Sequence, residues 1–228
     1  MKKVLVWDLP TRLFHWLLVA AVAAAYITGE TGGDWLLWHT RLGFLIAGLI
    51  AFRLLWGFIG STYARFPVFV HGPASIKAYL AGRWQGLGHN PLGALAVLAL
   101  LAAVTLQITS GLFAISDDSG IAGPFHALVS DALGTLATRW HHWIFDILAI
   151  LVALHIAAIV FYARIRKNNL LLPMLTGHKE VSAGESARGG GLLVTVIGLI
   201  VALAVTYAAS GLWLESPAPP PPATVPTR

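Results

Sequence analysis

The segment from Arg139 to Tyr162 is long and apolar enough to cross a lipid bilayer, yet it carries three histidines and an aspartate. Ionisable side chains in a membrane span are costly, so they usually face the interior of a helix bundle and serve a function. His141 and His155 are 14 residues apart, which is about 3.9 helical turns and about 21 Å of rise. They therefore point nearly the same way, one near each end of the span.

The composition requires a membrane protein and narrows the choice of metal ligands. The 228 residues are 57% hydrophobic and 11% charged, whereas soluble domains carry about 25% charged residues. The chain has no cysteine, which excludes thioether-attached haem, iron–sulfur clusters and disulfides. Met1 and Met174 are its two methionines, so histidines are the expected haem ligands. The basic residues are scattered over helix ends, which gives no support to nucleic-acid binding.

Hydropathy predicts five membrane spans and a short interfacial helix at residues 76–80. The predicted spans are residues 10–28, 37–59, 91–113, 139–162 and 191–214. Between them we expect an acidic loop at 116–138 and a basic loop at 164–188. The expected organisation is a membrane domain at 1–188, an additional transmembrane helix at 189–214, and an extended or disordered proline-rich tail at 215–228.

The charges sort by side when the N-terminus is placed inside. The inner residues are then Lys2, Lys3, Arg12, Arg65, Lys77, Arg83, Arg164, Arg166, Lys167, Lys179 and Arg188. The outer basic residues are Arg41, Arg139 and Arg228, and the outer acidic residues are Glu30, Asp34, Asp117, Asp118, Asp131 and Glu215. This pattern obeys the positive-inside rule and predicts a cytoplasmic N-terminus and a periplasmic C-terminus.

The same topology pairs the histidines by depth. His15 lies toward the cytoplasmic end of the first span, at the depth of His155, and His39 lies toward the periplasmic end of the second, at the depth of His141. Each depth thus offers two imidazoles from different helices, which is the ligand set of two stacked haems. Helical phase favours His141 over His142, which can reach Asp146 at i+4. Distortion near the helix end would reverse that choice.

Several residues near the histidines have two open interpretations. Arg12, Arg41, Arg53 and Arg139 are placed to hold haem propionates or, equally, to act as membrane-edge anchors. His89 and Asn90 lie at the start of the third span, where they can form part of a quinone site or act as a polar helix cap. His126 can join a periplasmic site or be a solvated loop residue. His71 and His178 look like loop residues.

The chain resembles the bacterial di-haem cytochrome b family that holds cytochrome b561 and the b-type cytochrome subunits of nickel–iron hydrogenases. The matching motifs are WDLPTRLFHW around His15, WHTRLG around His39, FRLLWGFIGSTYARF from Phe52 and HNPLG from His89, together with the fourth-span histidines. The resemblance implies an all-α integral membrane protein of the bacterial inner membrane. It would have a four-helix bundle enclosing two b haems, plus a fifth C-terminal transmembrane helix outside the shared core.

By position, the family's haem ligands fall on His15, His39, His141 and His155, and its quinone-site position falls on Asn90 near the cytoplasmic haem. Six-coordinate haem iron has no open site for oxygen, so electron transfer is the expected chemistry. The implied role is to carry electrons between the quinone pool and a periplasmic partner, either a c-type cytochrome or a hydrogenase-like subunit. Such an electron-transfer subunit is favoured over a stand-alone enzyme.

Two other functions remain. A superoxide:quinone oxidoreductase would need a basic funnel at the periplasmic haem, of which Arg41 and Arg139 form a thin version, while the acidic outer loops favour a basic protein partner. A haem-free membrane anchor would leave the paired histidines unexplained.

Overall fold

The computed structural model describes residues 1–115 and 121–214. Asp117 and Asp118 of the expected acidic loop, Glu215 and the expected proline-rich tail lie outside the described residues. Five described helices are long and apolar enough to cross a membrane, which confirms the all-α membrane fold. They are α1 (Leu9–Thr31), α2 (Trp35–Ile59), α5 (Pro91–Phe113), α6 (Asp131–Arg164) and α8 (Leu192–Ala209).

Short elements connect these helices. They are β1 (Lys2–Leu5), η1 (Thr62–Ala64), α3 (Phe66–Phe69), α4 (Pro73–Leu80), η2 (His126–Leu128), α7 (Leu171–Thr176) and β2 (His178–Val181). The helix α4 contains the expected interfacial helix. Neither strand was expected from the sequence, because segments of four residues are too short to show a hydrophobic alternation.

The expected acidic loop at 116–138 is wrong for its last eight residues, because α6 already begins at Asp131. Asp131 lies in the first turn, where a negative charge complements the helix dipole. Thr138 then ties this added part of α6 to the end of the α5 segment. The Ile115 N–H donates to its Oγ1 atom (2.9 Å), and its hydroxyl donates to the Ile115 carbonyl (2.6 Å). Hydropathy detects the apolar part of a helix, so it did not show that α6 begins eight residues before Arg139.

Two helices begin with the same local chemistry. Asp8 caps α1 by accepting a hydrogen bond from the Thr11 N–H (3.1 Å), and Asn90 caps α5 by accepting one from the Gly93 N–H (2.7 Å). A proline follows each cap within the first two helical positions, where its missing N–H costs nothing.

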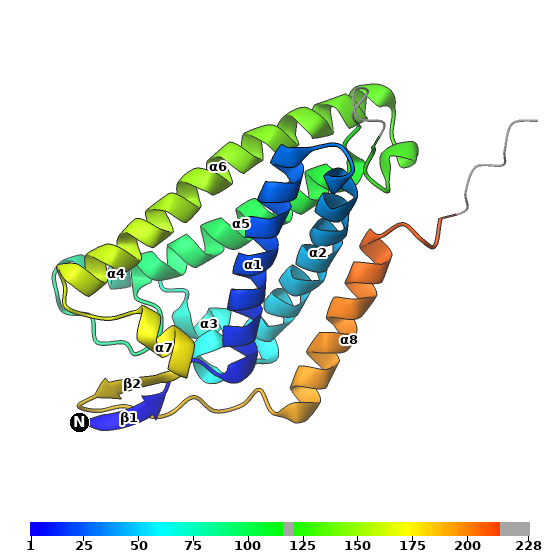
Figure 1. Ribbon diagram of the computed structural model, residues 1–228. Coiled ribbons are helices and arrows are strands. Elements are labelled where there is room, and N and C mark those ends of the chain that lie inside the picture. The colour runs from blue at the N-terminus through cyan, green and yellow to red at the C-terminus, as the bar shows by residue number, and fades with distance from the viewer. Residues whose placement is uncertain (116–120, 215–228) are drawn as a thin grey trace, which may run out of the picture.

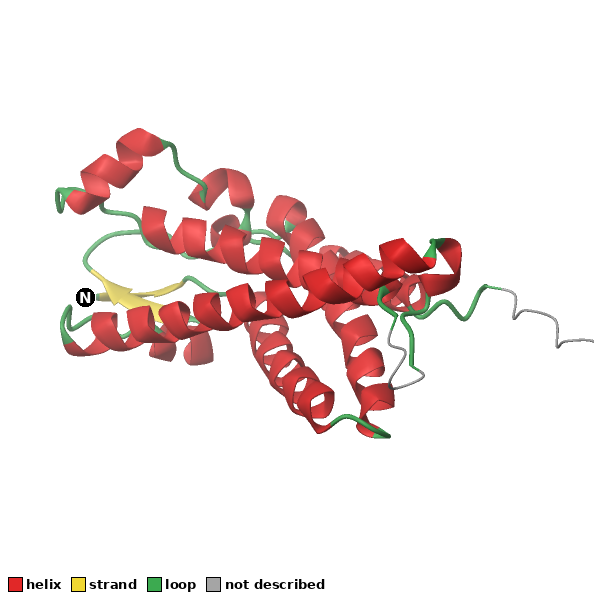
Figure 2. Cartoon of the chain, turned by 90° about the horizontal axis from the view of Figure 1, so that it is seen from above, coloured by secondary structure: helices red, strands yellow, loops and turns green. Residues whose placement is uncertain are grey.

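The long helices form two layers. Helix α1 packs on α2, α5 packs on α6, and α2 also contacts α5 (Figures 1 and 2). Between the layers, Tyr26 of α1 stacks on Phe145 of α6 with ring centroids 5.3 Å apart. The buried core joins both layers around Phe14, Ile50 and Leu148. Helix α8 packs on the outer side of α2, away from α6.

A small sheet closes one end of the bundle, which we call the sheet end; the opposite end, with the α1–α2 turn and the start of α6, is the far end. Strands β1 and β2 are antiparallel, with Lys2 opposite Val181. The N–H groups of Val6 and Trp7 both donate to the Gly177 carbonyl (2.8 and 3.0 Å). Gly177 ends α7 at φ 85°, a conformation that favours glycine. Residues before α1 are thereby joined to residues after α6.

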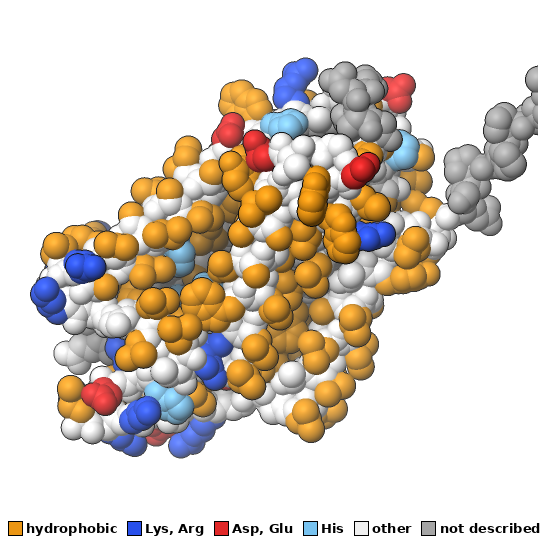
Figure 3. Space-filling view, in the orientation of Figure 1, with side chains coloured by type: hydrophobic (Ala, Val, Ile, Leu, Met, Phe, Trp, Pro, Cys, Tyr) orange, Lys and Arg blue, Asp and Glu red, His pale blue; other side chains and the backbone are white. Residues whose placement is uncertain are grey.

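The charges are unevenly distributed between the two ends. Lysines and arginines gather around the sheet end in the view of Figure 3, and most of the visible acidic side chains lie at the far end. The predicted orientation in the membrane depends on this separation of basic from acidic residues, and it makes the sheet end cytoplasmic. The orientation itself stays a prediction.

Close contact between α2 and α8 depends on Gly48. A Cβ atom there would collide with the Thr206 side chain and the Ala202 carbonyl of α8. We expect Gly48→Leu to destabilise the protein by about 1–3 kcal/mol through overpacking and to lower the melting temperature in detergent. Ala149→Leu adds bulk at an exposed position of α6 and is the control. Equal melting temperatures for the two variants would contradict this packing.

Candidate functional site

His39 of α2 and His141 of α6 face each other near the far end. Their ring centroids lie 6.0 Å apart, with the ring planes at 81°. A metal–imidazole bond is about 2 Å long, so two imidazoles on opposite sides of one metal ion have centroids about 6 Å apart. The pair therefore has the separation required of two ligands to one metal ion.

Backbone carbonyls orient both imidazoles. The Nδ1 atom of His39 donates to the Ala25 carbonyl of α1 (2.8 Å), and that of His141 donates to the Gln107 carbonyl of α5 (2.9 Å). The Ser110 hydroxyl lies 3.2 Å from the same His141 nitrogen. With Nδ1 protonated, Nε2 is left as the lone-pair nitrogen on each ring, which is the arrangement typical of metal-ligating histidines.

Two glycines make room for these rings. A Cβ atom on Gly29 would lie 2.9 Å from His39 Nδ1, and one on Gly111 would lie 2.9 Å from His141 Cε1. Sequence analysis did not identify either glycine. The sequence did hold a signal for Gly29, which follows His15 by 14 residues. The same interval separates His141 from His155, so Gly29 lies on the His15 face of its helix, at the depth of the other histidine pair.

The structure separates His141 from its neighbour. His141 is half-buried and its ring lies beside that of His39, whereas His142, the next residue of α6, is exposed. The structure therefore has the orientation of α6 that the helical phase predicted, with His141 facing the other helices. The assignment of ligands remains a prediction.

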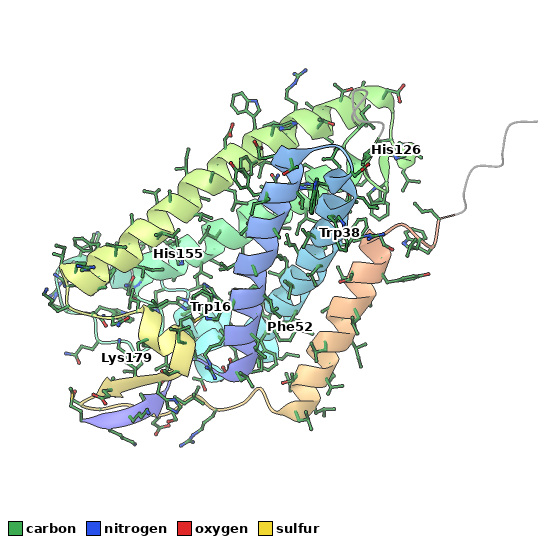
Figure 4. The ribbon with its side chains drawn as sticks, viewed as in Figure 1. Trp16, Trp38, Phe52, His126, His155 and Lys179 are labelled. Atoms are coloured by element: carbon green, nitrogen blue, oxygen red, sulfur yellow. The ribbon has the colours of Figure 1, made fainter. Side chains whose placement is uncertain are left out.

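His15 of α1 and His155 of α6 lie toward the sheet end, within electrostatic reach of each other. His155 is labelled in Figure 4, on the helix that also carries His141. The Nδ1 atom of His15 is buried, and the described residues offer it no hydrogen-bond partner. Leu148, midway between His141 and His155, is buried in the core, so this face of α6 points inward over the whole interval.

Three guanidinium groups near the sheet end have buried nitrogens without a partner among the described residues: Arg12 Nε, Arg53 Nη1 and Arg65 Nε. Arg53 is 4% exposed and lies over the Phe66 ring at 4.8 Å. Arg12 also donates from Nη1 to the Leu175 carbonyl of α7 (2.5 Å). The Asp8 carboxylate lies within electrostatic reach of Arg53, and haem propionates are anionic groups of the kind that engage the remaining guanidinium nitrogens.

The other arginines considered from the sequence lie elsewhere. Arg41 is exposed and stacks over Trp38 at 5.0 Å, near the far end, and Arg139 is exposed on α6. The choice between propionate binding and membrane-edge anchoring stays open for these two arginines. His126 is exposed and its Nδ1 donates to the Gly123 carbonyl (2.7 Å), and His178 lies in β2, where its Nδ1 donates to the Thr176 carbonyl.

His89 packs between the rings of Trp7 and Phe69, at centroid distances of 4.6 and 4.7 Å. Burial, reinforced by the positive charge of Arg53, lowers the pKa of His89 to about 3. The imidazole is therefore neutral at physiological pH, and its buried Nδ1 atom has no partner among the described residues.

A pocket opens beside Asn90 at the sheet end, between α4, the start of α5 and the end of α6. It is lined by Tyr79, Trp84, Asn90, Tyr162, Arg166 and Lys179, with two further residues. The Asn90 amide donates to the Tyr162 hydroxyl (3.2 Å). Asn90 thus serves as a helix cap and also lines a pocket, so the two interpretations of this residue are compatible.

The histidines come in pairs and not in larger clusters. No group of three or more His, Cys, Asp or Glu residues that could hold a metal ion occurs in the described parts of the chain. A bare metal ion needs three or four protein ligands, whereas haem iron takes four nitrogens from its macrocycle and needs two from the protein. The paired imidazoles, the lone-pair Nε2 atoms of His39 and His141 and the unbonded guanidinium nitrogens fit haem.

Comparison with known proteins gives a consistent result. A family model described as prokaryotic cytochrome b561 matches residues 6–177. A "Probable Ni/Fe-hydrogenase B-type cytochrome subunit" of Bradyrhizobium diazoefficiens is 24% identical over 212 residues, covering 78% of this chain and 86% of that protein. The protein of the same name from Azotobacter vinelandii is 27% identical over 210 residues, covering 76% and 87%. No solved structure matches the chain significantly.

The adjacent histidines of α6 provide a matched pair of variants. We expect His141→Ala to lose about half of the bound haem and His142→Ala to keep all of it, because only His141 faces His39. Haem content per chain, measured by the pyridine haemochrome assay on purified protein, checks this. Loss of haem in His142→Ala with full retention in His141→Ala would reverse the assignment.

Gly29 offers a test that leaves every histidine in place. Gly29→Val puts a side chain against His39, so we expect it to lower the haem content in the same way as His39→Ala. Ala23→Val adds bulk at an exposed position of the same helix and should bind haem normally. Full haem content with an unchanged spectrum in Gly29→Val would show that the ring is not held against α1.

Proposed function

The chain belongs to the prokaryotic cytochrome b561 family, and we propose that it is a di-haem b-type cytochrome that carries electrons across the membrane between the quinone pool and a periplasmic redox partner. The family supports a membrane b-type cytochrome as the starting point. The observation that carries the proposal further is the geometry of α6, which presents one inward-facing histidine toward each end of the bundle. Bis-imidazole haem iron supplies one-electron transfer without an open coordination site.

The residues divide this task between the two ends. His39 and His141 hold one iron between α2 and α6, and His15 and His155 hold the other between α1 and α6. The rise along α6 separates the two ligand positions by about 21 Å. Arg12, Arg53 and Arg65 neutralise propionates at the sheet end, where their buried nitrogens otherwise lack partners.

The pocket beside Asn90 is the proposed place of quinone exchange. Tyr162, which lines it, follows His155 by seven residues, so it lies on nearly the same face of α6 and about 10 Å farther along the helix. Hydroxyl and amide groups at this pocket suit the carbonyl oxygens of a quinone ring, and the aromatic side chains suit its faces.

The proposed partner at the far end is a periplasmic electron donor or acceptor, either a hydrogenase-like subunit or a c-type cytochrome. The first of these is supported by relatives named as hydrogenase cytochrome subunits. Acidic side chains gather at this end in Figure 3, which favours a partner with a basic face.

The experiment that tests the proposal is a dithionite-reduced minus oxidised spectrum with a pyridine haemochrome assay on the purified chain. We expect two b haems per chain. We also expect His15→Ala and His155→Ala to lose the same haem, because each removes one ligand of a single pair. One haem per chain would reject the electron path across the bilayer, and no haem would reject electron transfer altogether.

A further inference from the structure

The hydroxyl groups of Tyr79 and Tyr162 meet inside the pocket beside Asn90. Tyr79 comes from α4, Asn90 from the start of α5 and Tyr162 from the last turns of α6. The two tyrosine hydroxyls are in direct hydrogen-bond contact, and the Asn90 side chain reaches the Tyr162 hydroxyl. Three segments distant in the sequence therefore converge on one phenol oxygen.

The cap of α5 fixes the direction of the hydrogen bond between Asn90 and Tyr162. The Asn90 Oδ1 atom accepts from the Gly93 N–H (2.7 Å), so its Nδ2 atom is the one directed toward Tyr162, at 3.2 Å. An amide Nδ2 only donates, and the Tyr162 oxygen must therefore accept. The phenolic proton of Tyr162 is therefore not engaged by Asn90, and when Tyr79 is the donor in the bond between the two hydroxyls, that proton is available to a third group.

The pocket also has a route to water. Arg166 and Lys179 line it together with the tyrosines, and Arg166 is exposed. The ion pair found among the described residues joins Glu185 and Arg188, so neither of these two cations is neutralised by a described carboxylate. Positive charges at the mouth stabilise negative charge on a phenol oxygen deeper in the pocket.

We propose that Tyr162 is the proton donor to quinone in this pocket and that Tyr79 relays protons to it from water at the pocket mouth. The proposal rests on the proposed function, which supplies the quinone and the electrons. Reduction of a quinone to a quinol consumes two electrons, delivered one at a time from the reduced haems, and two protons. For each proton, the Tyr162 O–H bond breaks as the quinone oxygen gains its hydrogen, and Tyr79 then reprotonates the Tyr162 oxygen and is itself reprotonated by water.

The position of Tyr162 suits proton and electron arrival at the same place. It lies in the series His141, Leu148, His155 and Tyr162, spaced by seven residues, which keeps all four near one face of α6. His155, the proposed ligand of the haem nearest the quinone, and Tyr162, the proposed proton donor, are thus about 10 Å apart along one helix.

The test uses the full-length chain with both haems, reduced with a stoichiometric amount of dithionite and mixed with decylubiquinone in a stopped-flow instrument. We expect Tyr162→Phe to slow haem oxidation at saturating quinone at least tenfold, with the half-saturating quinone concentration changed less than twofold. Unchanged haem content and reduced spectra show that the variant is folded. Tyr207→Phe, which removes an exposed hydroxyl from α8, should react as the wild type does.

The relay role of Tyr79 has its own readout. Without the relay, protons reach Tyr162 directly from solvent, so we expect the rate of Tyr79→Phe to fall steadily as pH rises from 6 to 8, roughly in proportion to proton concentration. The wild-type rate should vary much less over this interval. An unaltered pH profile in Tyr79→Phe would remove the relay and leave Tyr162 as donor.

The outcomes separate the two proposals. Wild-type rates in Tyr162→Phe would overturn the proton-donor role and leave quinone exchange standing. A wild-type protein that binds two haems and does not react with decylubiquinone would overturn the proposed quinone exchange itself, and the proton donor with it.

Discussion

An imidazole inside a membrane needs a partner at each ring nitrogen, because no water is available to satisfy either one. At the far end, the structure provides the first partner from the backbone: a carbonyl of α1 for His39 and a carbonyl of α5 for His141. The second nitrogen of each ring, Nε2, keeps its lone pair for a metal ion. This requirement brings four helices together. Helices α2 and α6 carry the imidazoles, and α1 and α5 supply the carbonyls that accept their hydrogen bonds. Glycine at positions 29 and 111 permits that approach.

The sequence predicts those parts of the molecule that depend on the bilayer and on helical phase. The first three spans were placed within three residues, α5 at both of its ends, because hydropathy and proline starts mark them. The fourth span was expected eight residues too late at its start, and the fifth extends five residues beyond the end of α8. The inward direction of His141 followed from its spacing to His155. Features that depend on contacts between distant segments were not predictable. The β1–β2 pairing joins residues at opposite ends of the helical core and is extended by the bonds of Val6 and Trp7 to Gly177. The early start of α6 is stabilised by Thr138 and Ile115.

The candidate site shows the same division. Depth and phase selected four histidines, and the structure brings His39 and His141 together at 6.0 Å. The sequence also selected Asn90, but it did not show that Tyr79 and Tyr162 meet beside it. Tyr79 lies 83 residues before Tyr162, in a segment whose composition indicates only an interfacial helix. A pocket formed by three distant segments leaves no periodic pattern in the sequence. Asn90 could therefore be identified as a candidate, but its proximity to the two tyrosines could not.

The two ends of α6 differ in their electrostatics, and the difference bears on the proposed function. At the far end, bonds from Nδ1 to backbone carbonyls increase the electron donation of His39 and His141, which stabilises the oxidised state of a metal between them. At the sheet end, His15 Nδ1 lacks such a bond among the described residues, and the partly unpaired guanidinium groups of Arg12, Arg53 and Arg65 lie nearby. The propionates that these groups are proposed to hold offset their charge, so the missing Nδ1 bond decides the difference. Weaker electron donation from His15 would favour an electron at the sheet end, beside the pocket in which the quinone is proposed to accept it.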